Sequence, residues 1–230
     1  MDRLENLKNI IMYLMADEHV SHRIPSTLEE RQRMMRALMN VWEPRLIAED
    51  FLTMQDVELQ MQREDKVVVE FHDEGLTIWQ GDITRLKVDA IVNAANAQAL
   101  GCWAPLHNCI DNCIHSAAGI QLRKECADKM QGRLLATGDA FITQGYNLPA
   151  HHVIHTVGPI IPDDIPTKEQ EEQLAQCYRS CLDLAEQNGL ESIAFCCIST
   201  GVFHFPNELA ARIAIETVKS YPRHTLKTIV

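Results

Sequence analysis

GDITRLKVDAIVNAAN, residues 81–96, joins a carboxylate turn to a short apolar strand that runs into asparagines. Asp82 follows a predicted strand end, where a carboxylate can accept from a ligand amino group or from its own backbone in an Asx turn. The run AIV at 90–92 is continuously apolar, as is typical of a strand covered on both faces. Asn93 and Asn96 come directly after it, and neutral amides there can hold a sugar hydroxyl or only fix a loop. The stretch therefore predicts a buried strand with polar groups at its carboxyl end.

Short apolar runs alternate with helical patterns on both sides of this stretch. Such alternation predicts an α/β layer fold whose ligand cleft lies beyond the carboxyl ends of strands. Helices are predicted near 109–130, 168–188 and 206–220, the last with Pro206 in its first turn. Strands are predicted over 67–71, 76–79, 90–92, 140–143, 153–157, 193–198 and 228–230.

The chain before residue 66 carries helical patterns only. Apolar residues between Leu4 and Met15 recur at steps of three and four, which predicts an amphipathic helix. A second helix is expected to begin at Ser26, with Glu29 completing a capping box, and a third to lie between residues 45 and 61. We therefore divide the chain into a helical extension, 1–65, and an α/β domain, 66–230.

Composition limits the partners that this chain can have. The 230 residues carry a formal net charge of −11, which excludes a broad electrostatic grip on nucleic acid or on an anionic membrane. Phosphate groups would have to be bound locally, by backbone amides. The N-terminus does not resemble a signal peptide, and no run has the length of a membrane span. We therefore expect a cytoplasmic protein whose eight cysteines are reduced.

Cys102, His107 and Cys109 lie in the irregular stretch GCWAPLHNC, residues 101–109. Thiolate and imidazole are ligands that Zn²⁺ prefers, and a loop can turn three of them towards one point. Two core cysteines and a surface histidine would produce the same pattern, so the spacing alone leaves both interpretations open. Three ligands would leave one coordination position for water or substrate, as in catalytic zinc sites.

The other cysteines and histidines are interpreted as packing or surface residues. Cys113 shares a helical face with apolar residues and is expected in the core, whereas His115 is expected to be solvated or hydrogen-bonded. Cys196 and Cys197 lie in an apolar run and are expected to be core residues. The histidines at 151, 152 and 155 are expected at the surface and in the core, and not as a second metal site.

Two further segments contain candidate site residues. Asp111 stands near the start of the predicted helix after the cysteine loop, as a stabilising first-turn carboxylate or as a general base that takes a proton from water. The loop STGVF at 199–203 follows a predicted strand, and its successive N–H groups can cradle a diphosphate without lysine or arginine.

The order of these motifs resembles one known family. GDIT, DAIVNAAN, D-x-x-IH-x-AAG, GYNLPAHHVIHTVGP and ISTGVFHFP follow one another as in macrodomains, the ADP-ribose-binding α/β/α modules, over about residues 76–230. The long cysteine loop stands where most relatives have glycines. This loop and the helical extension resemble the zinc-dependent bacterial branch of the family. The resemblance implies a three-layer α/β/α macrodomain with a mixed central sheet behind an N-terminal helical extension.

The resemblance also implies roles for individual residues. Asn96 would hold the distal ribose, and Asp111 would orient or deprotonate the attacking water. The family usually has an aromatic residue that stacks on adenine just beyond the last strand, and this chain ends before it. Because the chain stops directly after the strand-like run 227–230 with no closing helix, we expect the C-terminal end to be truncated. The implied zinc ligands are Cys102, His107 and Cys109, and the implied adenine-binding residues are Asp82 and Ile83. The implied diphosphate-binding residues are Ser199, Thr200, Gly201, Val202 and Phe203.

The function implied by the resemblance is a zinc-dependent protein mono-ADP-ribosylhydrolase. Its partner would be an ADP-ribosylated protein, and the family branch implies a lipoylated carrier protein modified by a sirtuin-type transferase. Two alternatives remain open at this point. One is a reader that binds ADP-ribose without turnover and uses zinc only to fold the loop; the other is an esterase that acts on O-acyl-ADP-ribose.

Overall fold

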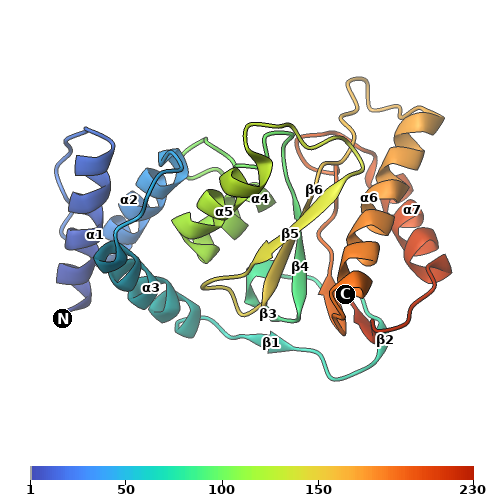
Figure 1. The fold of residues 1–230 in the computed structure, drawn as a ribbon, viewed down its shortest axis with the longest axis horizontal. Helices are drawn as coiled ribbons and strands as arrows, with labels where there is room; N and C mark the ends of the chain where they lie inside the picture. The colour runs from blue at the N-terminus through green and yellow to red at the C-terminus, as the bar shows by residue number, and fades with distance from the viewer. Residues whose placement is uncertain (1) are drawn as a thin grey trace.

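A mixed six-stranded sheet forms the centre of the α/β domain in the computed structural model, which describes residues 2–230. Its spatial order is β2-β8-β7-β4-β6-β5, and all neighbouring strands are parallel except β5 and β6, which are antiparallel (Figure 1). The pairing of β4 with β6 runs along the whole length of both strands and places Asn93 beside His155. The strands are β2 (Gly75–Leu76), β4 (Ala90–Ala94), β5 (Ala140–Gln144), β6 (His152–Thr156), β7 (Ser192–Ala194) and β8 (Thr228–Ile229).

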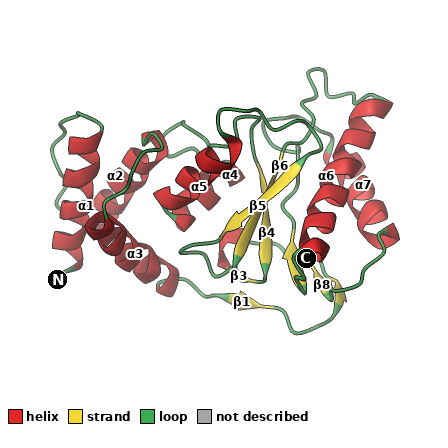
Figure 2. Cartoon of the chain, viewed as in Figure 1, coloured by secondary structure: helices red, strands yellow, loops and turns green. Residues whose placement is uncertain are grey.

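Helices cover both faces of this sheet (Figure 2). On one face, α4 (Ile110–Ala118) and α5 (Ile120–Met130) pack on Ile91 and Val153. On the other face, α6 (Lys168–Gln187) and α7 (Asn207–Ser220) pack on strand residues of the opposite parity. Because successive strand side chains point to opposite faces, the continuously apolar runs fill two cores at once. The predicted three-layer fold with a mixed sheet is confirmed.

The N-terminal extension has a core of its own. Its helices α1 (Arg3–Asp17), α2 (Leu28–Val41) and α3 (Glu49–Glu64) enclose a cluster that includes Trp42 and Phe51, and Ile120 of α5 joins it. The helix α3 ends one residue before the predicted domain boundary, which itself stays a prediction. Between the extension and the main sheet, β1 (Val69–Glu70) pairs in parallel with β3 (Leu86–Lys87).

Helix ends differ from the predictions where the local signals compete. The second helix is capped by Thr27, whose hydroxyl accepts from the Glu30 N–H, and not by the pair Ser26 and Glu29. The helix predicted over 109–130 is broken at Gly119, whose φ of 105° lies in a region open to glycine. Pro206 is the N-cap of α7 and not its first residue.

Strand ends differ as well. The strand predicted over 193–198 stops at Ala194, because its pairing with β4 covers only Ile193 and Ala194. Cys197 is therefore exposed and Cys196 half-buried, and the expectation that both are core residues is wrong for Cys197. All eight cysteines are free thiols. Within residues 2–230, no helix is long and apolar enough to cross a membrane.

Candidate functional site

A cavity of about 710 Å³ opens beyond the carboxyl ends of β4 and β7. Two stretches that are distant in the sequence meet in it: one runs from the end of β4 through the following loop to the start of α4, and the other is the loop after β7. Its lining includes the following predicted site residues: Asn96, Cys102, His107, Cys109, Asp111, Ser199, Thr200, Gly201, Val202 and Phe203. The structure therefore brings the predicted catalytic, metal and diphosphate residues to one cavity.

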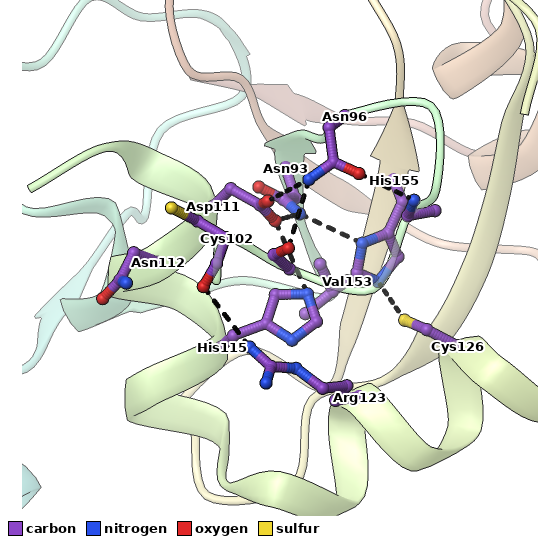
Figure 3. A network of polar contacts seen from close by, with 12 residues as sticks. Asn93, Asn96, Cys102, Asp111, Asn112, His115, Arg123, Cys126, Val153 and His155 are labelled. Carbon is purple, nitrogen blue, oxygen red and sulfur yellow. Dashed lines mark hydrogen bonds and ion pairs between the residues drawn. The ribbon is translucent and has the colours of Figure 1, made fainter. Parts of the chain in front are cut away.

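Asp111 is buried at the start of α4 and is held by amides from β4 and its loop (Figure 3). The Asn93 side-chain amide donates to Asp111 Oδ1 over 2.7 Å, and the Asn96 amide lies 3.5 Å from Oδ2. Burial raises the pKa of Asp111 to about 6, while the Asn93 hydrogen bond and the charge of Arg123 oppose that rise. The carboxylate thus lies fixed at the cavity wall.

The side chain of Asn93 is oriented by His155, on the side away from Asp111. It is fully buried, and its amide also lies 3.1 Å from His155 Nδ1. With that nitrogen as the acceptor, His155 Nε2 carries the proton and donates to Thr143 Oγ1 over 3.0 Å. The chain from Thr143 through His155 to Asn93 therefore sets the position of Asp111.

Cys102, His107 and Cys109 converge as the metal prediction requires. Their ligand atoms all lie within 4.8 Å of one another, and Cys102 Sγ is 3.7 Å from His107 Nδ1. Cys109 caps α4, where its sulfur accepts from the Asn112 N–H. Burial first, and then the neighbouring Cys102, raise the pKa of Cys109 to about 12, so a cation is needed to stabilise its thiolate. Two thiols and an imidazole at this separation fit a zinc ion.

A second group with metal-binding geometry is buried behind the cavity. His115, Cys126 and His155 also place ligand atoms within 4.8 Å of one another, so this group could hold a metal ion. His115 is 5% exposed, and the expectation that it is solvated or hydrogen-bonded is wrong: Nε2 lies 3.5 Å from Asp111 Oδ1, but neither ring nitrogen makes a hydrogen bond among residues 2–230. Burial lowers the pKa of His155 to about 3, and it also lowers the pKa of His115. Both rings are therefore neutral near pH 7.

Sequence reasoning missed this group because its members lie on α4, α5 and β6. One signal was available. His155 lies two residues after Val153 and therefore points to the same face of the strand. That face packs under α4 and α5, so the His155 ring lies in the same core layer as Val153.

The loop 199–203 presents unpaired polar groups to the cavity. Ser199 Oγ is buried and lacks a hydrogen-bond partner within the described residues. Across residues 2–230, the backbone N–H groups of Gly201, Val202 and Phe203 likewise donate to no protein acceptor. A Cβ atom at Gly158 would lie 2.0 Å from Ser199 Oγ, so glycine is required for this close approach. Such a loop can accept an anion through its backbone.

Asp82 and Ile83 do not line this cavity. The Asp82 carboxylate accepts from the Thr84 N–H and hydroxyl and pairs with Lys66, which is the Asx-turn arrangement. Ile83 is buried in the core beneath α4. The assignment of both residues to adenine stays a prediction.

The layered fold and this cleft, with an anion-accepting loop opposite a buried carboxylate, define an α/β/α ligand-binding domain. Residues 92–214 match the family model described as "Macro domain", and the chain belongs to the macrodomain family.

Relatives of this chain are similar over most of their lengths. It is 44% identical to the "Protein-ADP-ribose hydrolase" of Staphylococcus aureus, with 100% of this chain and 91% of that protein covered. It is 47% identical to a protein of the same name from Treponema medium, with 92% and 86% covered. Among solved structures, it is similar to an Oceanobacillus iheyensis macrodomain with ADP (41% identity, TM-score 0.60, 69% and 84% covered). It is also similar to a Trypanosoma brucei macrodomain in complex with ADP-ribose (29% identity, TM-score 0.62, 89% and 89% covered).

Proposed function

We propose that this chain is a zinc-dependent hydrolase that removes mono-ADP-ribose from modified protein side chains. The observation that carries the proposal is the single cavity that joins Asn96, Asp111, the cysteine loop and the loop 199–203. Full-length relatives described as protein-ADP-ribose hydrolases support the same activity.

Different residues of the cavity bind the substrate and activate the water. The N–H groups of 201–203 and the hydroxyl of Ser199 bind the diphosphate, and the Asn96 amide binds hydroxyls of the distal ribose. Asp111 accepts a proton from water, whose oxygen attacks the anomeric carbon of that ribose. The bond from this carbon to the protein side chain breaks, and the side chain leaves with the proton. The products are free ADP-ribose and the unmodified protein.

The cysteine loop would hold the zinc ion. When bound by Cys102, His107 and Cys109, zinc supplies Lewis-acid chemistry beside Asp111. We favour this group over the buried one for two reasons. His107 is exposed and the loop lines the cavity, whereas His155 is already engaged by Asn93 and Thr143.

The substrate we propose is an ADP-ribosylated protein, and more narrowly a lipoylated carrier protein modified by a sirtuin-type transferase. The narrower proposal rests on the family resemblance alone. We propose the cytoplasm as the location, because eight free thiols without a disulfide are typical of a reducing compartment.

Release of ADP-ribose from a mono-ADP-ribosylated protein tests the activity. We expect turnover by the wild-type chain and a loss of about 10²- to 10⁴-fold in rate for Asp111→Asn, the range for a missing general base. Asn96→Ala should raise KM as well, whereas Gln98→Ala, an exposed residue of the same loop, should match wild type. Full activity in Asp111→Asn would refute the assigned role. Binding of ADP-ribose without release would favour the reader, and faster release from O-acetyl-ADP-ribose would favour the esterase.

Elemental analysis tests the metal. Protein purified without added zinc should contain about one equivalent per chain, and Cys102→Ala or His107→Ala should lose it. Cys126→Ala is the matched control for the buried group and should keep it. Zinc that is retained in the first two variants and lost in the third would move the site to His115, Cys126 and His155.

A further inference from the structure

The helix α2 of the N-terminal extension contacts the backbone of the cysteine loop, 101–109, at several points. We propose that α2 is a structural part of the metal site. Arg36 and Asn40 act as positioning residues, because they hold the loop in the conformation that brings His107 to Cys102 and Cys109. The inference rests on the proposed function for the identity of the metal, but the hold on the loop is independent of it.

Asn40 supports the turn that directs His107. Its buried side-chain oxygen accepts from the Leu106 N–H over 2.9 Å, and its amide donates to Ser116 of α4 over 3.0 Å. Leu106 has a φ of 61°, in the left-handed region. That conformation is unfavourable for a residue with a Cβ atom, and it persists only where the surroundings fix it. Asn40 supplies that restraint directly before a ligand residue.

Arg36 contacts the backbone of the ligand residue His107 itself. Its guanidinium donates to the carbonyl of His107 over 2.8 Å. It also donates twice to Asn112 Oδ1, over 2.8 and 3.3 Å, and the buried Asn112 amide donates to the carbonyl of Ala104 over 2.9 Å. One arginine from the extension therefore restrains the loop both directly and through the start of α4.

Arg123 of α5 fastens the end of α2 to the loop. Its guanidinium donates to the carbonyls of Asn40 and Trp42, each over 2.8 Å. These carbonyls at the helix end lack partners within α2 and favour a positive charge. The same group lies 3.4 Å from the carbonyl of Cys102 (Figure 3). It also lies 4.1 Å from the ring centre of Trp103. The end of α2 and the first ligand residue thus share one anchor.

This arrangement orders the loop before a metal arrives. A free loop would lose backbone entropy on binding the metal, for each residue that becomes fixed. Contacts behind the ligands lessen that loss, and their removal lowers metal affinity by about 10- to 100-fold in other proteins. We expect the same range here for the loss of Arg36 or Asn40.

Zinc affinity of the full chain tests the proposal, with Zn²⁺ alone as the probe and a chromogenic chelator as the competitor. Asn40→Leu and Arg36→Met should each bind zinc about 10- to 100-fold more weakly than wild type. Arg33→Met changes an exposed arginine of the same helix and should match wild type. Asn40→Asp keeps an acceptor for the Leu106 N–H and should restore affinity. Affinities of the two test variants equal to that of Arg33→Met would overturn the proposal.

Hydrogen exchange of the Leu106 amide in metal-free protein supplies the second readout. Exchange should be faster in Asn40→Leu than in Arg33→Met. Faster exchange with unchanged zinc affinity would overturn the role of α2 in the metal site. If Asn40→Leu does not fold, the affinity of Arg36→Met decides, because that side chain is only half-buried. If wild type binds no zinc, the proposal that the cysteine loop binds zinc is refuted. The exchange rates of the Leu106 amide then decide by themselves whether the extension holds the loop.

Discussion

Replacement of Arg123 by methionine measures how strongly the extension is joined to the macrodomain. Arg123 is 3% exposed and donates to the carbonyls of Asn40 and Trp42, each over 2.8 Å. Each carbonyl left without a partner costs about 1–3 kcal/mol, and the contact with the Trp103 ring adds up to about 2 kcal/mol. Burial lowers the pKa of Arg123 to about 10 although the charge of Asp111 opposes that shift, so the net cost of keeping the charge in the folded protein offsets roughly 3 kcal/mol of these contributions. We expect the free energy of unfolding to fall by about 2 kcal/mol.

Urea unfolding of the metal-free chain checks this value. Tryptophan fluorescence is the signal, because Trp42 and Trp103 lie beside Arg123. Lys124→Met is the matched control, since its partner Asp128 is exposed on the same helix, and its effect should stay within about 0.5 kcal/mol. An Arg123→Met variant as stable as this control would refute the reasoning, because it would mean that the guanidinium contributes nothing beyond its own desolvation.

Three further predictions use other parts of the molecule. Gly158→Ala should cost about 1–3 kcal/mol of stability, because the new Cβ would lie 2.0 Å from Ser199 Oγ, whereas Gly201→Ala meets open space and should unfold at the wild-type temperature. His155 has a folded pKa of about 3, so the unfolded chain takes up its proton first as the pH falls below about 6.5. The contribution of neutral His155 to the free energy of unfolding is complete above that pH and is lost at about 1.4 kcal/mol per pH unit towards pH 3. In urea unfolding, the free energy of unfolding of His155→Gln should therefore depend less steeply on pH than that of wild type. Equal slopes for the two proteins would contradict this prediction. Treatment of wild type with a chelator should abolish ADP-ribose release and added zinc should restore it; activity that survives complete zinc removal would count against the metal.

The layers of the fold were predictable because they depend on local patterns. Apolar runs and helical stripes are properties of neighbouring residues, and they placed β4, β6 and α6 within a residue or two of their observed bounds. The ends of elements were less predictable, because they depend on partners. The run 193–198 stays apolar beyond Ala194, yet the strand stops where its pairing with β4 stops, and Cys197 is exposed as a result.

The candidate site shows the same division. The sequence by itself determined which residue types follow the strands, the order of the motifs, and the closeness of Cys102, His107 and Cys109 along the chain, which made them candidate ligands. Only the tertiary structure decided that His115, Cys126 and His155 meet, and that Arg36 reaches the carbonyl of His107 across 71 positions. Contacts of that kind arise from the packing of whole helices against a sheet and against one another. No local pattern in the chain specifies which side chains such packing brings together.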